Sequence, residues 1–315
     1  MSINAAESKL QQIDIELIDR NPENPRINFR QAELDELQES IRLYGVQVPV
    51  ALYKEGKRYV LIDGERRWRC CLKLNKKTIP ALVQEKPSTL TNLLLMFNIH
   101  SLREQWDLLT IALKLPKVIA FLAEDLKRSP NEREVAEKTG LARGVIRRCK
   151  LLMELPDEYK QEIKNELVKP RSQQVLTEDF FIEMERALTT VERAMPNVIQ
   201  DRDAARRVLI EKYKNDTIGN LVTLRQIPKI ARAEYVEADK QKAQKVLQKL
   251  FQSNKYSIDE AYTESVSGAY IERDLSTRVD GLSEKLDSIT VDEIDDDLRV
   301  KLQALCEKIQ RMLEE

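Results

Sequence analysis

The spacing of apolar residues divides the chain into a mixed N-terminal part and a helical remainder. Short runs rich in β-branched residues lie at 13–18, 46–52, 58–62 and 78–84, and segments of helical period lie at 32–43 and 65–74. Runs of four to eight residues bounded by Gly, Pro, Asn or Asp are typical of strands. We therefore predict an α+β domain over residues 11–88, preceded by a tail at 1–10.

From about residue 89 onward, the apolar positions recur with the period of an α-helix. Helices are predicted, with short breaks, at 89–97, 104–126, 132–139, 142–152, 157–167, 177–194, 200–213, 221–251 and 281–313. The start of the segment 221–251 is expected to be interrupted near Pro228. We assign residues 89–172 to a helical domain and residues 173–315 to a helical C-terminal region. The predicted fold class is thus an α+β N-terminal domain followed by all-α domains.

Composition agrees with this division and limits the kinds of ligand surface. The chain is 42% apolar and 33% charged, with 5% aromatic residues and only 8 glycines. Low aromatic and glycine contents favour helices over an all-β fold. The net charge is −1, from 52 basic and 53 acidic residues, so a nucleic-acid surface has to be a local basic patch.

Metal, disulfide and membrane chemistry find little support in the sequence. Four cysteines without a Cys-x-x-Cys pair and a single histidine are too few for a zinc site or a disulfide framework. The N-terminus shows no signal-peptide pattern, and no apolar run approaches the roughly 20 residues that span a bilayer. We expect a cytoplasmic protein without a membrane partner.

One pair of predicted helices has the spacing of a helix-turn-helix. Ala136 is small enough to let two helices cross closely, and Gly140 can adopt the left-handed turn conformation at no steric cost. Ile146 would then pack the second helix onto the first. Ser129 or Asn131 would cap the first helix. The remaining core would come from Val135, Leu141, Val145 and Cys149.

The second helix of this pair, at 142–152, has no acidic residue. Its basic residues are Arg143, Arg147, Arg148 and Lys150. The alternative is an ordinary helical hairpin with a solvated basic face. Since base edges are usually read from the start of such a helix, near Arg143, we expect these four residues to contact double-stranded DNA.

Three motifs precede the helix-turn-helix. They are Asn-Pro-Glu-Asn-Pro-Arg at 21–26, Ser-Ile-Arg-Leu-Tyr-Gly-Val-Gln-Val-Pro at 40–49, and a strand followed by Gly-Glu-Arg-Arg-Trp-Arg at 64–69. A helix start presents free N–H groups, and arginines add forked anion contacts. The third motif therefore predicts a polyphosphate or phosphodiester site. Because Glu65 lies among the arginines, a salt-bridged surface helix is the alternative.

These motifs, in this order and ahead of a helix-turn-helix, resemble the ParB family of plasmid and chromosome partition proteins. The most specific is the family's GERRxR segment, found here at 64–69. Its NPxxPR segment is at 21–26, and its SI…G…P segment is Ser40-Ile41, Gly45 and Pro49. The resemblance covers about residues 12–156 and implies a ParB/sulfiredoxin-type N-terminal domain.

The resemblance also implies a ligand and a set of residues that bind it. It implies a CTP pocket with Mg²⁺ and a homodimer that clamps DNA when the nucleotide is bound. By the resemblance, the phosphates would be met by Gly64, Glu65, Arg66 and Arg67, assisted by Arg26. Asn98 corresponds to the Asn of the family's ENxxR segment and would coordinate Mg²⁺.

The chain departs from the family pattern at two places. The Glu that precedes this Asn in the family, associated with hydrolysis, is Phe97 here, which can neither position a water nor hold a metal. No catalytic residue is therefore assigned, and a weak CTPase activity stays open, as does a pocket role for His100. The GHAR-like segment of the family is replaced by Lys-Pro-Arg-Ser-Gln-Gln-Val-Leu at 169–176, which indicates a divergent member.

The C-terminal region offers surfaces and no evident chemistry. An apolar stripe with spacings of 4, 4, 3, 4 and 3 comprises Ile294, Leu298, Leu302, Leu305, Ile309 and Met312. Such a stripe packs within the monomer or against a second copy. Lysines 240, 242, 245 and 249 form either a solvated face or a DNA-backbone contact. The acidic run at 292–297 suits a helix N-terminus.

Together these features predict a sequence-specific double-stranded DNA-binding protein whose grip is tuned by CTP. Plasmid or chromosome partition and transcriptional control both fit, with a location on a nucleoid or plasmid. An enzyme with a ParB-like domain, either a nuclease or a nucleoside triphosphatase, is the alternative. The resemblance further suggests a partner ATPase recruited by the helical C-terminal half.

Overall fold

The computed structural model describes residues 9–24, 31–101, 106–290 and 293–314. The chain divides into two compact units, Met1–Arg186 and Ala187–Glu315, and the boundary falls within one helix, α8 (Glu178–Ala194). The first unit contains a sheet with helices and the second unit is helical, so the predicted fold class is confirmed.

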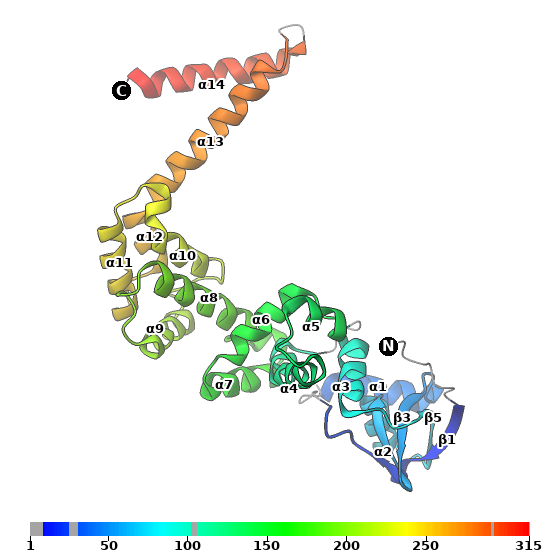
Figure 1. Cartoon of the computed structure of the whole chain (residues 1–315). Coiled ribbons are helices and arrows are strands. Elements are labelled where there is room, and N and C mark those ends of the chain that lie inside the picture. Colours follow the sequence, from blue (N-terminus) through cyan, green and yellow to red (C-terminus); the bar gives the residue numbers. More distant parts are fainter. Residues whose placement is uncertain (1–8, 25–30, 102–105, 291–292, 315) are drawn as a thin grey trace. The chain divides into compact units, whose positions relative to one another are not determined.

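The N-terminal part of the first unit is built on a mixed five-stranded sheet in the order β1-β5-β3-β4-β2 (Figure 1). The strands are β1 (Lys9–Asp14), β2 (Ile18–Asp19), β3 (Val50–Glu55), β4 (Arg58–Asp63) and β5 (Thr78–Gln84). β1 pairs antiparallel with β5, and β3 pairs antiparallel with β4 through a tight hairpin. The pairs β3–β5 and β2–β4 are parallel, so other elements connect them.

Both faces of the central strands are buried. Along β4, Leu61 packs in the larger core, whereas Val60 and Ile62 pack on the opposite face with Tyr53 of β3. This division follows from the alternation of side chains along a strand. The larger core lies under α1 (Gln31–Tyr44) and α2 (Glu65–Lys73), and α3 (Thr89–Ser101) packs against β4.

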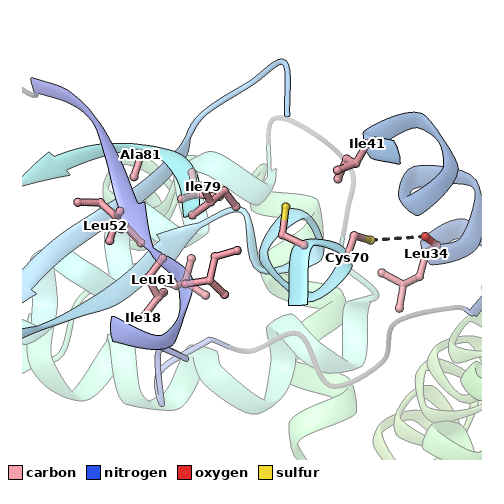
Figure 2. Close-up of a cluster of buried hydrophobic side chains, with 12 residues drawn as sticks. Ile18, Leu34, Ile41, Leu52, Leu61, Cys70, Ile79 and Ala81 are labelled. Carbon is pink, nitrogen blue, oxygen red and sulfur yellow. Dashed lines mark hydrogen bonds between the residues drawn. The ribbon is translucent and has the colours of Figure 1, made fainter. Parts of the chain in front are cut away.

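Two adjacent cysteines of α2 belong to the larger core. Cys70 and Cys71 are both buried, and the Cys70 thiol lies 3.5 Å from the carbonyl oxygen of Leu34 on α1 (Figure 2). Burial raises the pKa of both thiols, which keeps them protonated. Cys70 is thus a small core residue.

The first predicted strand, 13–18, is wrong in its extent. β1 starts already at Lys9, within the predicted tail, and ends at Asp14, after which a 3₁₀ turn covers Ile15–Leu17. The Asp14 carboxylate accepts the N–H of Glu16 at 3.0 Å and so caps the turn. The turn lets Ile13, Ile15 and Ile18 all reach the core, which strict alternation would not allow.

The second predicted strand, 46–52, is also displaced, since β3 starts at Val50. Gly45 ends α1 with φ of 73°, and the carbonyls of Val48 and Pro49 accept hydrogen bonds from the Arg67 side chain. These carbonyls therefore face an arginine rather than a neighbouring strand. The other predicted strands, 58–62 and 78–84, match β4 and β5 within one residue.

The rest of the first unit is helical. Its helices are α4 (Leu108–Leu126), α5 (Glu132–Thr139), α6 (Arg143–Met153) and α7 (Asp157–Val168), followed by α8. The predicted helix 104–126 starts too early, because the Asp107 carboxylate accepts the N–H of Thr110 at 2.7 Å and caps α4. Residues 102–105 lie outside the described ranges.

The second unit continues from α8 into six further helices over its described residues. They are α9 (Arg202–Lys214), α10 (Gln226–Ala231), α11 (Lys240–Gln252), α12 (Ile258–Ser265), α13 (Ser267–Asp287) and α14 (Asp296–Glu314). The predicted helix 221–251 is interrupted, but not at Pro228, which lies within α10. 3₁₀ turns at Thr223–Arg225 and Ala233–Val236 divide the segment, and Glu237 adopts φ of 57°. The predicted helix 281–313 is likewise two helices, α13 and α14.

Side-chain caps account for two of these boundaries. The Asp295 carboxylate accepts the N–H of Leu298 at 2.7 Å, so the acidic run does lie at a helix start. Ser257 and Glu260 form a capping box at the start of α12, a helix that the periodicity did not reveal. Over the described ranges, no helix is long and apolar enough to cross a membrane.

Candidate anion site and nucleic-acid interface

The junction between β4 and α2 requires a glycine. Gly64 adopts φ of 99°, and a Cβ at this position would lie 2.6 Å from Cγ1 of Val50. An alanine would therefore be strained and would also collide with the core. Because Gly64 has no side chain, no side-chain hydrogen bond caps the start of α2. In general, the start of a helix attracts an anion through its backbone N–H groups and its positive dipole end.

Glu65, the first residue of α2, is a buried carboxylate that holds several cationic and amide donors. It accepts from the side chain of Asn24 at 2.5 Å, from Nε of Arg20 at 2.8 Å and from Nη2 of Arg69 at 2.6 Å. A buried carboxylate is tolerated only when it is paired in this way. Glu65 thus connects the first and third sequence motifs.

The Asn-Pro motif is also attached to the helices that follow the sheet. Asn21 is buried, and its side-chain amide donates to Asn92 of α3 at 3.2 Å. The side-chain oxygen of Asn21, Oδ1, accepts a hydrogen bond from the N–H of Glu23 at 3.0 Å. Glu23 in turn forms an ion pair with Lys117 of α4. The loop is therefore fixed as far as Asn24. Arg26, expected to assist the phosphates, lies outside the described residues.

The two central arginines of the Gly-Glu-Arg-Arg motif have different surroundings. Arg67 donates to Pro49 O at 2.6 Å and to Asp63 at 2.9 Å, and so fastens the loop before β3. Arg66 donates to the backbone carbonyl of Glu33 at 3.0 Å, and its side chain is 26% exposed compared with 14% for Arg67. Both are salt-bridged, as the alternative prediction held, but they flank an uncapped helix start.

Of the residues that the family motif places near this site in α3, the structure describes the side chain of Phe97 but not those of Asn98 and His100. Asn98, expected to bind Mg²⁺, lies in α3, but its side chain and that of His100 are outside the described part. Phe97 is fully buried and meets Trp106 edge to face at 5.3 Å, as a core residue does. Among the described residues, no group of three or more His, Cys, Asp or Glu could hold a metal ion.

The helix-turn-helix geometry follows the sequence prediction closely. Gly140 ends α5 with φ of 73°, and its N–H donates to the carbonyl of Ala136 at 2.9 Å. Asn131, and not Ser129, caps α5 in a capping box with Glu134. The hydrogen bond from Arg128 and the N–H of Asn131 lower the pKa of Glu134 to about 2. The core of the pair includes Val135, Leu141, Ile146, Cys149 and Leu152.

Three of the four basic side chains of α6 are exposed and that of Arg148 is half-buried, and most of them have acidic partners. Glu132 at the start of α5 pairs with Arg147 at 2.9 Å and with Lys150 at 3.2 Å. Arg148 pairs with Asp179 of α8. Arg143, at the start of α6, has no ion pair among the residues that the structure describes. The face is therefore a positive surface with two acids at its margin.

The sequence prediction missed the partners of both sites. Asn24 stands within the recognised Asn-Pro motif, and its role could have been suspected from the lone buried acid, Glu65, in the helix that follows. Glu132 and Asp179 carried no signal, because an ion pair 15 or 31 residues apart depends on how helices cross. The phosphate contacts of Gly64, Glu65, Arg66 and Arg67, and the DNA contacts of α6, stay predictions.

Comparison with known proteins places these features in a family. Residues 2–99 match the model of the ParB N-terminal domain. The probable chromosome-partitioning protein ParB of Pseudomonas putida is 32% identical over 161 residues, which are 50% of this chain and 53% of the relative. The chromosome-partitioning protein ParB of Caulobacter vibrioides is 31% identical over 148 residues, 46% of each chain.

Two solved structures were also matched. One is a truncated ParB from Caulobacter crescentus complexed with the centromeric parS site, with TM-score 0.44 and 23% identity over 70% of this chain and 98% of that chain. The other is the same protein complexed with CTP-gamma-S, with TM-score 0.28 and 26% identity over 56% of this chain and 92% of that chain.

The N-terminal part of the chain is therefore a ParB N-terminal domain, carrying the Gly-Glu-Arg-Arg helix and followed by a helix-turn-helix. Through this domain the chain is similar to ParB proteins, as its three motifs predicted. The matched region spans about half the length of the first curated relatives.

Proposed function

We propose that this protein is a sequence-specific double-stranded DNA-binding protein that acts through α6. The observation that carries the proposal is the division of this helix into two faces. Ile146, Cys149 and Leu152 are buried, whereas the opposite side presents the four basic residues Arg143, Arg147, Arg148 and Lys150 without an acid in the helix. With a net charge of −1, the chain has its basic surface where a helix-turn-helix reads the major groove.

Two kinds of DNA contact would contribute on this surface, one to affinity and one to sequence specificity. Arginine and lysine contacts to phosphates supply affinity at any sequence, and they weaken as salt rises. Bidentate contacts to base edges supply the choice of sequence. The curated relatives are named chromosome-partitioning proteins, and partition of a chromosome or plasmid is the cellular role that we propose for this chain.

The start of α2 is proposed to bind the triphosphate of CTP together with Mg²⁺. The left-handed backbone of Gly64 lets α2 start directly after β4, and the positive end of this helix together with Arg66 would attract a phosphate. CTP itself follows from the family motifs at 21–26 and 64–69. When bound, the nucleotide would supply concentrated negative charge, which Mg²⁺ partly offsets.

Hydrogen bonds among the chain's own residues would hold the segments around this pocket in place. Glu65 orients Asn24, Arg20 and Arg69 from its buried position, and Arg67 fastens the 46–49 loop. Through Asn21 and Asn92 the same loop touches α3, which leads towards the helix-turn-helix. A change at α2 on nucleotide binding could therefore reach α3, and through it the helices that precede α5, by way of this loop.

The C-terminal helices are proposed to form a homodimer. Over their described residues, neither α13 nor α14 has a buried residue. Exposed apolar side chains follow α13 at Ile271, Leu275, Val279, Leu282 and Leu286, and α14 at Leu298, Leu305, Ile309 and Met312. The i, i+4 and i, i+3 spacings suit a second copy, and a dimer would match paired half-sites on DNA. A partner ATPase stays a prediction of the family resemblance.

The alternative of a nuclease has less support. Metal-dependent hydrolysis of DNA needs clustered acids, and the described ranges contain no such cluster. Selection of bound duplexes from a random-sequence library by the full chain, with CTP and Mg²⁺ present, tests the proposed function. We expect one motif to be enriched. Retention of DNA without an enriched motif would contradict sequence-specific binding.

A further inference from the structure

One acidic side chain contacts two of the four basic residues of α6. Glu132, in the first turn of α5, accepts from Nε of Arg147 at 2.9 Å with one carboxylate oxygen. It accepts from Nζ of Lys150 at 3.2 Å with the other oxygen. The two contacts join residues 15 and 18 positions apart, so they bridge the two helices of the helix-turn-helix.

The ion pair with Glu132 does not involve the two terminal amino groups of Arg147. Only Nε of the guanidinium contacts Glu132, and neither terminal amino group has a partner among the described residues. Because the guanidinium is planar, a fixed Nε restricts the plane and the direction of the remaining two-pronged end. That end can form the bidentate contact with a guanine edge or a phosphate. At 59% exposed, the side chain is accessible to such a partner.

The position of Glu132 keeps its carboxylate charged. It lies at the N-terminal turn of α5, where the helix dipole favours a negative charge. Hydrogen bonds from Arg147 and Lys150 lower the pKa of Glu132. The carboxylate is therefore ionised throughout the neutral range, and it can act on both cations at once.

We propose that Glu132 is a positioning residue for sequence recognition, which holds Arg147 in the orientation that reads a base. The inference rests on the proposed DNA-binding function of α6. A held side chain loses less conformational freedom on binding its correct partner. The same negative charge disfavours loose phosphate contacts at incorrect sequences. Glu132 thus raises the ratio of specific to non-specific affinity through Arg147.

Arg148 gives a useful contrast within the same helix. Its partner is Asp179 of α8, outside the helix-turn-helix pair, and its side chain is only 32% exposed. Arg147 is therefore the arginine whose orientation depends on α5 itself. A substitution at Glu132 should affect recognition differently from one that merely removes a negative charge near DNA.

The matched variants are Glu132→Gln and Glu137→Gln. Both remove one carboxylate from α5, but Glu137 pairs with Arg133 on α5 and not with α6. The duplex that the full-length wild-type chain enriches from a random library, and a scrambled duplex of equal length, are the probes in fluorescence anisotropy. For Glu132→Gln we expect the ratio of the two affinities to fall about five- to tenfold, with unchanged or tighter binding to the scrambled duplex. Glu137→Gln should keep the wild-type ratio.

An unchanged ratio in Glu132→Gln would overturn the proposal, and so would an equal gain in affinity for both duplexes. Absence of any enriched motif with the wild-type chain would instead contradict the DNA-binding proposal itself, and this inference with it. Arg147→Lys is a second test that does not alter α5. It keeps the charge and loses the planar fork, so we expect the same fall in the ratio with little change in the salt dependence.

Discussion

The side chain of Asn24 donates a hydrogen bond to the buried Glu65 carboxylate at 2.5 Å, across 41 residues of sequence. The contact shows that two of the family motifs form one structural unit. With Arg20 and Arg69 on the same carboxylate, Glu65 is the acceptor on which the Asn-Pro loop and the start of α2 are both fixed.

Glu65→Ala should therefore destabilise the first unit. The substitution removes the shared acceptor and leaves three donors to find water, which we expect to reduce the free energy of unfolding by about 1–3 kcal/mol. Urea denaturation measures the loss. Glu39→Ala is the matched control, since it removes an exposed ion pair with Arg42 on α1. A surface pair of this kind contributes little, and equal losses in the two variants would argue against the structural role of Glu65.

Gly64→Ala tests whether the junction of β4 and α2 needs a glycine. The φ of 99° and the collision of the new Cβ with Val50 should together reduce stability by about 2–5 kcal/mol. Gly56→Ala separates the two effects, because Gly56 has φ of 62° but open space around its Cβ position. We expect roughly 1–2 kcal/mol there. Similar losses at both glycines would show that Val50 moves aside easily.

Arg66→Ala should abolish triphosphate binding and leave the fold intact. The side chain is partly exposed beside the start of α2, and among the described residues its hydrogen bond and ion pair are both with Glu33. Calorimetric titration with CTP and Mg²⁺ measures the affinity, and circular dichroism checks the fold. Arg42→Ala, on the exposed side of α1, is the control and should bind as the wild type does. Retained affinity in Arg66→Ala would remove this arginine from the pocket.

Replacing Arg147 and Arg148 together by alanine should weaken DNA binding. A lost base contact should reduce affinity for the enriched duplex by about tenfold. Lost phosphate contacts should instead reduce affinity for all duplexes and flatten the salt dependence. Arg133→Ala removes an exposed arginine of α5 as the control. If both affinity and salt slope stay at their wild-type values, α6 is not the DNA-reading helix.

Glu178 should make the stability of the first unit depend on pH. Burial raises the pKa of this carboxyl to about 7 from 4.5, although its hydrogen bond with the N–H of Leu109 opposes the shift. Its folded pKa is above the unfolded value, so its contribution is fully present below about pH 4.5 and is lost as pH rises through 7. The loss is on the order of 3 kcal/mol.

Glu178→Gln keeps an oxygen that can accept from Leu109 but cannot ionise. Relative to the wild type, it should therefore gain stability between pH 5 and pH 8, because the wild-type carboxyl ionises as the pH rises through its raised pKa of about 7. Urea denaturation of both proteins at the two pH values measures the difference, in which all other titrating groups cancel. A wild type that loses no stability relative to Glu178→Gln would mean that the carboxyl stays solvated.

The parts that the sequence predicted well are those encoded by contiguous residues. Strand β5 and helix α5 have the predicted bounds, and Gly140 forms the expected turn, because local periodicity and glycine placement determine them. The segment 221–251 was expected to break near Pro228, but Pro228 lies inside α10 and the breaks lie on either side of that helix. The apolar spacing of the segment continues through two 3₁₀ turns, and the left-handed residue there is Glu237 rather than a glycine.

The organisation of the two sites was only partly predictable for the same reason. The Gly-Glu-Arg-Arg motif predicted an anion site. In the structure, however, Glu65 is a buried acceptor that binds the side chains of Asn24, Arg20 and Arg69. Likewise the basic helix was evident, whereas its pairing with Glu132 and Asp179 depends on packing between separate helices. Contacts of this kind have no period that a single sequence displays.

We propose that CTP bound at α2 controls how long α6 stays bound to DNA. The most direct measurement is the dissociation rate of the full chain from its enriched duplex, with CTP, ATP or GTP present at equal concentration with Mg²⁺. We expect CTP alone to change the rate, and Arg66→Ala to remove the effect. A dissociation rate that is the same with all three nucleotides and without any would contradict this proposal.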